Sequence, residues 1–359
     1  MKSDSLSLRQ RLGLEIFRKL ENEKIKEHPL NQLFWECTLR CNLHCRHCGS
    51  DCKKIAGQPD MPLQDFLRVL DNVALYKNPN QVFISITGGE PLMRKDLEEC
   101  GREITKRGFP WGMVTNGFFL TQQRLDALMK SGLRSIAISL DGFATDHNWM
   151  RGNSESYDHA IEAIKTMIAE PNLIFDIVTC INKHSFLRLK EMKEFLIGLG
   201  VKHWRIFTIF PVGRAAEDSD LQLSNQEMRE VMEFIRQTRS EGRIHLNYGC
   251  EGFLGNYEGK VRDNLFSCHA GITVGSVLID GSISACPSIR ADYHQGNIYK
   301  DNFMDVWNEK FLPYRDRTWM KKDECGDCKY FSYCKGSGMH LRDGEGKLLF
   351  CHLKRLKGE

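Results

Sequence analysis

The sequence contains no long hydrophobic run and no large excess of charge of either sign. Its 50 lysine and arginine residues nearly balance 47 aspartate and glutamate residues, which leaves a net charge of +3. So small a charge argues against nucleic acid or an anionic membrane as the main partner. No apolar stretch approaches the roughly 18 residues that span a bilayer, and the N-terminus lacks the apolar core of a secretory signal. We therefore expect a cytoplasmic protein without a membrane span.

Cysteine, in contrast, is abundant, with 14 residues in a chain of 359. A chain of this length can form a hydrophobic core without disulfides. Where an export signal is lacking, clustered cysteines more often bind metal than form disulfides. The spacing of the cysteines favours metal binding, and a disulfide framework is the alternative.

Short apolar runs alternate with segments of helical periodicity from residue 33 to about residue 240. We expect strands at 33–37, 82–87, 111–115, 135–140, 173–178 and 203–209. We expect helices near 62–76, 94–107, 121–131, 157–169, 185–199 and 224–241. Six such alternations predict an α/β fold with a parallel sheet, as a partial (β/α)6 TIM-like barrel; a doubly wound sheet is the alternative. Either fold places a site at the carboxyl ends of the strands.

Two further regions flank the expected barrel. The N-terminal region predicts an amphipathic helix, because Leu12, Ile16 and Leu20 recur at helical spacing. We expect this helix to pack on the main domain, and a membrane-surface or partner helix is the weaker alternative. Residues 271–286 predict a β-hairpin that turns at Asp280-Gly281, within a small C-terminal α+β domain organised by metal. The expected domains are residues 1–32, 33–242 and 243–359.

The first expected strand leads directly into a loop with the spacing Cys41-x3-Cys45-x2-Cys48. Thiolates are the soft ligands of iron–sulfur clusters, and three of them hold three irons of a 4Fe–4S cluster. The fourth iron is then open to a small molecule, whereas a structural zinc site closes with four ligands. The motif and its position resemble the radical S-adenosylmethionine (SAM) superfamily.

The resemblance extends to the residues that follow the next strands. The segment Thr87-Gly88-Gly89-Glu90-Pro91 is similar to the element that holds the methionine amino group of SAM. Ser139 and Arg151 are spaced as in the family, where the serine faces the ribose and the arginine pairs with the SAM carboxylate. Asn148 stands where aspartate is usual, and a surface arginine is the alternative for Arg151. The residues implied to bind SAM are His47, Gly88, Gly89, Glu90, Asn116, Ser139, Asp141, Arg151 and Asn182.

The C-terminal cysteines resemble the SPASM domain, an extension of many peptide-modifying radical SAM enzymes that usually binds two auxiliary 4Fe–4S clusters. The pattern departs at Gly338, where the family has a ligand of the first auxiliary cluster. Cys250 is the expected substitute, which leaves an open iron for substrate, and His269 is less favoured. A single cluster, or zinc at 325–351, is the alternative. The resemblance assigns Cys268 and Cys286 to the first cluster and Cys325, Cys328, Cys334 and Cys351 to the second.

Four cysteines stand outside these motifs, and we expect them to be packing residues: Cys37, Cys52, Cys100 and Cys180. For Cys37 and Cys52, which flank the loop, a redox or ligand role is the alternative.

The resemblance implies an enzyme that reductively cleaves SAM to a 5′-deoxyadenosyl radical, which abstracts hydrogen from a peptide or protein substrate. The modification is a crosslink, an oxidation or an epimerisation, and the electron donor is of the flavodoxin or ferredoxin type. Pro287 argues against formylglycine formation, because sulfatase-maturating relatives carry an aspartate base there. The cysteine loop is also similar to a bacterial subgroup paired with small lipoproteins. The alternatives are oxidation of a small molecule and a non-enzymatic cysteine-rich metal protein.

Overall fold

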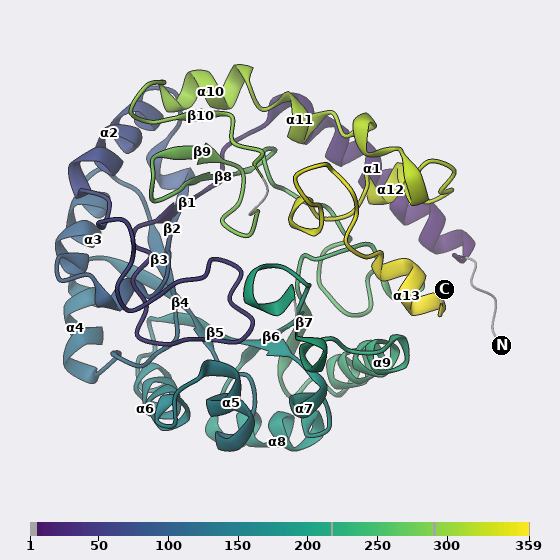
Figure 1. The fold of residues 1–359 in the computed structure, drawn as a ribbon, viewed down its shortest axis with the longest axis horizontal. Coiled ribbons are helices and arrows are strands. Elements are labelled where there is room, and N and C mark those ends of the chain that lie inside the picture. Colours follow the sequence, from purple (N-terminus) through teal and green to yellow (C-terminus); the bar gives the residue numbers. More distant parts are fainter. Residues whose placement is uncertain (1–5, 217, 290–291, 359) are drawn as a thin grey trace.

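A curved sheet runs through the protein, and helices cover its outer side (Figure 1). The computed structural model describes residues 6–216, 218–289 and 292–358. Within these residues the sheet has ten strands in the order β10-β9-β8-β1-β2-β3-β4-β5-β6-β7. The strands are β1 (Gln32–Glu36), β2 (Phe83–Thr87), β3 (Trp111–Thr115), β4 (Leu133–Ser139), β5 (Ile174–Ile181), β6 (His203–Thr208), β7 (His245–Tyr248), β8 (Val274–Val277), β9 (Ser282–Ser284) and β10 (Gly296–Asn297).

The strands β1 to β7 are parallel and lie side by side in chain order. A doubly wound sheet reverses its strand order at a switch point, whereas this order does not reverse. The predicted α/β fold with a parallel, barrel-like sheet is therefore confirmed. The connecting helices are α2 (Leu63–Ala74), α3 (Leu97–Lys106), α4 (Gln122–Lys130), α5 (Ala144–Arg151), α6 (Ser156–Ile168), α7 (Lys183–Phe186), α8 (Leu189–Leu199) and α9 (Asn225–Glu241).

Strand β7 extends the parallel part of the sheet beyond the six strands expected from the sequence. Its four residues read His-Leu-Asn-Tyr, with polar and apolar side chains in alternation. It lies at the edge of the sheet, where one-sided burial is enough, so it lacks the continuous apolar run that marks the central strands.

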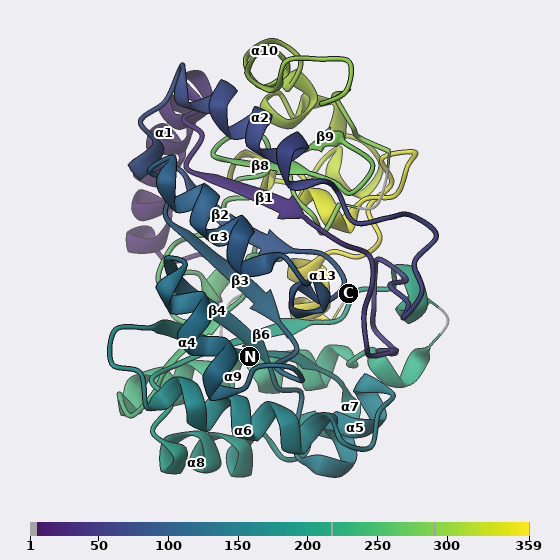
Figure 2. The ribbon, with the colours of Figure 1, turned by 90° about the vertical axis from the view of Figure 1, so that its left-hand side faces the viewer.

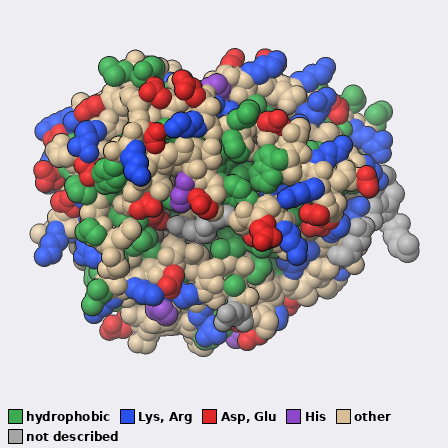
Figure 3. Space-filling model, turned by 45° about the horizontal axis from the view of Figure 1, so that its top comes forward, with side chains coloured by type: hydrophobic (Ala, Val, Ile, Leu, Met, Phe, Trp, Pro, Cys, Tyr) green, Lys and Arg blue, Asp and Glu red, His purple; other side chains and the backbone are tan. Residues whose placement is uncertain are grey.

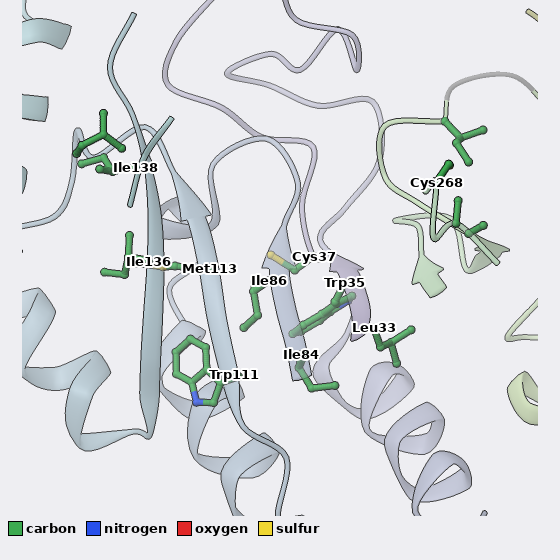
Figure 4. Packing of buried hydrophobic residues seen from close by; sticks show 14 of the residues in the cluster. Leu33, Trp35, Cys37, Ile84, Ile86, Trp111, Met113, Ile136, Ile138 and Cys268 are labelled. Atoms are coloured by element: carbon green, nitrogen blue, oxygen red, sulfur yellow. The ribbon is translucent and has the colours of Figure 1, made fainter. Parts of the chain in front are cut away.

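The core lies between the sheet and the surrounding helices. Figure 4 shows Trp35, Ile86 and Met113 on neighbouring strands within it. Trp35 is fully buried and stacks on Phe66 of α2, with ring centroids 4.4 Å apart. Each large apolar side chain buried in this way contributes about 1.5–3 kcal/mol to stability. The packing holds the carboxyl ends of the strands, from which the functional loops start, at one edge of the sheet.

The predicted hairpin is present as β8 and β9, and Gly281 turns the chain with φ +84°. Strand β8 pairs in parallel with β1, so the hairpin extends the barrel sheet on the side of the first strand (Figure 2). This pairing places the C-terminal part of the chain beside the loop that follows β1. The C-terminal helices are α10 (Phe303–Glu309), α11 (Leu312–Arg315), α12 (Phe331–Cys334) and α13 (His352–Lys357).

The N-terminal helix α1 (Leu8–Glu27) packs through a different face from the one that the sequence predicts. Leu12, Ile16 and Leu20 are 57%, 63% and 59% exposed, whereas Leu14 is buried. On the packed side, Tyr333 of α12 donates a hydrogen bond from its hydroxyl to Glu15 Oε1 at 2.7 Å. Two faces of this helix carry apolar residues, and periodicity alone does not say which of them meets the protein. Residues 1–5 of the expected N-terminal segment lie outside the described residues.

Charges of both signs are interspersed over the face shown in Figure 3. No helix within the described part of the chain is long and apolar enough to cross a membrane.

Candidate active site and iron–sulfur centres

The cysteine loop after β1 gathers the three thiols that the sequence predicts to bind a cluster. Cys41 and Cys45 pack together, with Cys48 against them. A further thiol, Cys52, which we expected to flank the loop as a packing residue, belongs to the same group. Its spacing of four residues from Cys48 continues the motif and is the signal that could have revealed it. Three thiols on one loop form a donor set suited to iron.

The thiols of this loop differ in how readily they ionise. Burial raises the pKa of Cys41 to about 12 and also raises that of Cys45, where the Arg151 charge opposes the increase. A hydrogen bond from Cys52 lowers the pKa of Cys48 to about 5. Because iron binds thiolates, loading a cluster here requires Cys41 and Cys45 to release their protons.

Arg151 lies against the cysteine loop and is buried, so the surface alternative is excluded. Its Nε atom is 2.7 Å from Asp141 Oδ2 in a buried ion pair. Its Nη1 atom donates to Cys45 Sγ at 3.7 Å. Asp141 is fixed in turn by the backbone N–H of Cys180, 2.9 Å from Oδ1. The predicted SAM ligands Asp141 and Arg151 thus form one unit that touches a cluster cysteine.

The two glycines after β2 hold the cysteine loop in place. The Gly89 N–H donates to the Thr38 carbonyl at 2.7 Å. A Cβ on Gly88 would lie 2.2 Å from that same carbonyl, and its φ is +146°. Only glycine has both the conformational freedom and the small size for this contact. We expected these glycines to lie close to a ligand. In the structure they lie against the backbone of the cysteine loop.

Glu90 joins the ends of two strands. Its Oε1 atom accepts hydrogen bonds from Thr115 Oγ1 at 2.7 Å and Leu92 N at 3.0 Å, and its Oε2 atom accepts from Asn116 N at 2.7 Å. The Asn116 side chain reaches toward the cluster loop and donates to Asn42 Oδ1 at 2.9 Å. The structure therefore brings Glu90 and Asn116 together beside the cysteines.

Of the other predicted SAM ligands, Ser139 and Asn182 lie at strand ends, and His47 lies in the cysteine loop. Ser139 ends β4 and is half-buried. Asn182 caps α7, accepting from His184 N at 2.8 Å, and its side-chain nitrogen has no partner among the described residues. His47 is half-buried with its Nδ1 atom unpartnered there, and burial lowers its pKa to about 4.

A cavity of about 330 Å³ joins the cluster loop to the C-terminal region. One wall carries residues of the cluster and SAM loops, and the opposite wall carries neighbours of the C-terminal cysteines. The residues that line it include His47, Gly49, Gly88, Cys180, Phe207, Phe210, Glu251, Pro287 and Ser288.

Glu251 is a residue of this cavity that sequence reasoning missed. Its Oε2 atom accepts hydrogen bonds from the Tyr248 hydroxyl and from Thr208 N, the latter at 3.0 Å. Its Oε1 atom is buried without a partner among the described residues. Burial opposes ionisation, but His352, whose Nε2 atom lies 3.5 Å from Oε2, and the hydrogen bonds from Thr208 and Tyr248 hold the pKa of Glu251 below its ordinary value. A lone glutamate beside Cys250 carries no motif, so no sequence signal marked it.

Four of the C-terminal cysteines lie around one cavity, and Cys250, Cys268 and Cys286 lie near one another. Cys325, Cys328, Cys334 and Cys351 line one cavity of about 340 Å³. Burial raises the pKa of Cys286 to about 12, and the charges of Cys250 and Cys268 act in the same direction. Among the described residues, no three His, Cys, Asp or Glu side chains are arranged to hold a single metal ion. A 4Fe–4S cluster instead bonds each thiolate to a different iron.

We expect the buried His147 to make the free energy of unfolding depend on pH. Asp141 N donates to its Nδ1 atom at 3.1 Å, so Nε2 carries the proton and faces Ser156 Oγ at 3.0 Å. Burial lowers its pKa from 6.5 to about 3. The unfolded chain therefore takes up this proton first, and the stabilisation present above pH 6.5 is lost as pH falls toward 3. One such group lowers the free energy of unfolding by about 2 kcal/mol between pH 7 and pH 5.

Urea unfolding of the apoprotein at pH 7 and pH 5 measures this effect. Other buried histidines act in the same direction, so the comparison with His147→Gln is decisive. The variant should lose about one proton from the difference in proton uptake between unfolded and folded states. If the stability of the variant depends on pH as that of the wild type does, His147 is not the source of the effect.

Comparison with known proteins agrees with this geometry. The Radical SAM superfamily model matches residues 35–196, and SPASM, an iron–sulfur cluster-binding domain, matches residues 268–329. An AdoMet-dependent heme synthase of Oleidesulfovibrio alaskensis is 25% identical over 86% of this chain and 84% of its own. The mycofactocin maturase MftC of Mycolicibacterium smegmatis is 26% identical over 86% of this chain and 77% of its own.

Two solved structures share the fold. Streptococcus suis SuiB bound to S-adenosylmethionine has a TM-score of 0.69 at 19% identity, over 92% of this chain and 79% of that chain. The structure of anSMEcpe with bound AdoMet and Cp18Cys peptide has a TM-score of 0.68 at 18% identity, over 92% and 94%. Cluster loop, barrel and cysteine-rich C-terminus agree with both family models: the chain belongs to the radical SAM enzymes, which use a 4Fe–4S cluster and SAM, and carries a SPASM domain that binds auxiliary iron–sulfur clusters.

Proposed function

We propose that this enzyme abstracts hydrogen from a side chain of a peptide or protein that enters the cavity between the two cluster regions. One observation carries the proposal: the same cavity of about 330 Å³ is lined by His47 and Gly88 on the SAM side and by Glu251 and Pro287 beside the auxiliary cysteines. A group held there lies within reach of both. The volume is at the lower end for ligand pockets and suits one amino-acid side chain.

The protein's own contribution is to bind, orient and exclude water. When bound, the cluster and SAM supply a 5′-deoxyadenosyl radical on reduction by a flavodoxin- or ferredoxin-type donor. The Asp141–Arg151 pair holds the cluster loop through Cys45. Phe207 and Phe210 give the cavity an apolar wall, which keeps water away from a reactive intermediate.

Glu251 supplies the polar contact of the cavity for the substrate. An ionised, buried carboxylate with one unpartnered oxygen favours a hydrogen-bond donor such as a backbone N–H or an ammonium group. It disfavours a carboxylate at the same place by charge repulsion. A peptide offers such donors at every residue.

Replacing Glu251 by glutamine should slow substrate-dependent turnover about ten- to a hundredfold, because a hydrogen bond to a charged group contributes about 1.5–3 kcal/mol. Cleavage of SAM without substrate should change little, because we place Glu251 at the substrate. Both rates are measured as 5′-deoxyadenosine formation under anaerobic conditions. Glu191→Gln, on the exposed surface of α8, is the matched control. Equal loss of both rates in E251Q would contradict a role at the substrate.

A second candidate substrate is an iron porphyrin, which the names of the heme synthase and the Fe-coproporphyrin III synthase relatives favour. Against it stand the small cavity and the Glu251 carboxylate, which would face the anionic side chains of a coproporphyrin. The deciding experiment incubates the reconstituted enzyme with SAM and dithionite, and with either Fe-coproporphyrin III or short peptides encoded beside its gene. Mass spectrometry of a peptide altered in step with 5′-deoxyadenosine supports the proposal, whereas conversion of the porphyrin alone overturns it.

A further inference from the structure

The first auxiliary cluster that the sequence predicts would have three cysteine ligands for four irons. Cys250, Cys268 and Cys286 form this group, whereas the other four SPASM cysteines line a separate cavity. A 4Fe–4S cluster held by protein alone takes four ligands. The fourth ligand must therefore come from another side chain or from a small molecule.

The segment from Gly338 to His340 lies against these cysteines. The backbone N–H of Met339 donates to Cys268 Sγ at 3.5 Å. Gly338 has no side chain, and a Cβ built there would lie 2.7 Å from His340 Cε1 and 3.0 Å from His340 Nδ1. The imidazole of His340 thus folds back over Gly338 and fills the space that a side chain at that position would take.

The ring nitrogens of His340 are free to bind a metal. His340 is half-buried, and no hydrogen bond to either of its ring nitrogens is found within the described residues. The ring contacts Phe210, with centroids 4.8 Å apart. Imidazole is a good ligand for iron, and histidine replaces cysteine on one iron of Rieske clusters.

We propose that His340 binds, through a ring nitrogen, the iron of the first auxiliary cluster that Cys250, Cys268 and Cys286 leave open. The nitrogen lone pair forms the bond, so no electron is transferred and no proton is released by a neutral ring. The other histidine beside this group, His269, is turned toward α1: its Nδ1 atom lies 3.8 Å from Glu21 Oε2, and neither atom has a hydrogen bond within the described residues.

This ligand set has two consequences. A neutral imidazole in place of a thiolate makes the cluster less negative by one charge and raises its reduction potential. It also closes the iron to substrate, so the cluster acts by electron transfer rather than by binding the substrate. Because Phe210 contacts His340 and lines the substrate cavity, the ligand lies on the wall that the substrate meets.

The experiment uses the full chain, reconstituted anaerobically, labelled with ¹⁵N-histidine and reduced with dithionite without SAM. Pulsed EPR detects ¹⁵N hyperfine coupling to a cluster, and iron is counted in the same samples. His340→Gln removes the proposed ligand, and His269→Gln tests its competitor. His340→Cys offers a thiolate from the same backbone position and keeps the cluster complete.

We expect a ¹⁵N coupling in the wild type and in H269Q, and its loss in H340Q. H340C should lose the coupling and show a lower reduction potential for one cluster. If both auxiliary clusters are present, it should retain about eight irons in addition to the four of the SAM cluster. If H340Q loses about four irons and H340C recovers them, the proposal is also supported. Absence of coupling in the wild type, its persistence in H340Q, or its loss only in H269Q overturns it. None of these outcomes depends on the identity of the substrate.

Discussion

Replacing Cys41, Cys45 and Cys48 together by alanine is expected to abolish SAM cleavage and to remove about four irons per chain. The three thiols lie together on one loop, and Arg151 donates a hydrogen bond to one of them, Cys45. With its ligands removed, the SAM cluster does not form. Anaerobic reconstitution, iron counting and assay of 5′-deoxyadenosine measure both effects.

The control for this variant is Cys100→Ala. Cys100 is fully buried in α3, in the main core rather than in the cluster loop. The Cys100→Ala variant removes a thiol that is not a cluster ligand. We therefore expect full iron content and full SAM cleavage, at somewhat lower stability. Continued SAM cleavage by the triple variant would refute the assignment of the cluster loop. The iron that stays bound in the triple variant counts the auxiliary clusters.

Replacing Gly88 by alanine is expected to weaken SAM binding at least tenfold. A Cβ at this position would lie 2.2 Å from the Thr38 carbonyl, and φ +146° is strained for any residue with a side chain. Such backbone strain alone costs about 1–3 kcal/mol, and tenfold in affinity corresponds to about 1.4 kcal/mol. The loop that carries the cluster cysteines must move to relieve the contact.

Gly49→Ala is the matched control, because a Cβ there meets nothing within 4 Å. Both glycines line the cavity, so the comparison isolates the contact with Thr38. SAM affinity is measured by calorimetry on reconstituted protein at equal iron content. Equal affinity in the two variants would show that the contact with the loop does not position SAM.

The fold was predictable because the parallel strands are covered on both faces. Central strands such as β2 and β3 read as continuous apolar runs, and the crossover helices carry regular periodicity. The edge strand β7 was missed because it is short and half polar. The packed face of α1 was wrongly assigned because Leu14 and the Leu12–Ile16–Leu20 stripe lie on different sides of one helix.

By itself, the sequence determined the chemistry of the cofactor. Cysteines a few residues apart in one loop stay close together in any fold, because the chain itself limits the distance between neighbouring thiols. Only the tertiary structure showed what lies opposite that loop. Glu251 reaches the cavity from beyond β7, and the backbone N–H of Met339 reaches Cys268 from 71 positions further along the chain. Such contacts depend on how the sheet curves and on where β8 pairs with β1. Neither feature can be predicted from the spacing of residues in the sequence.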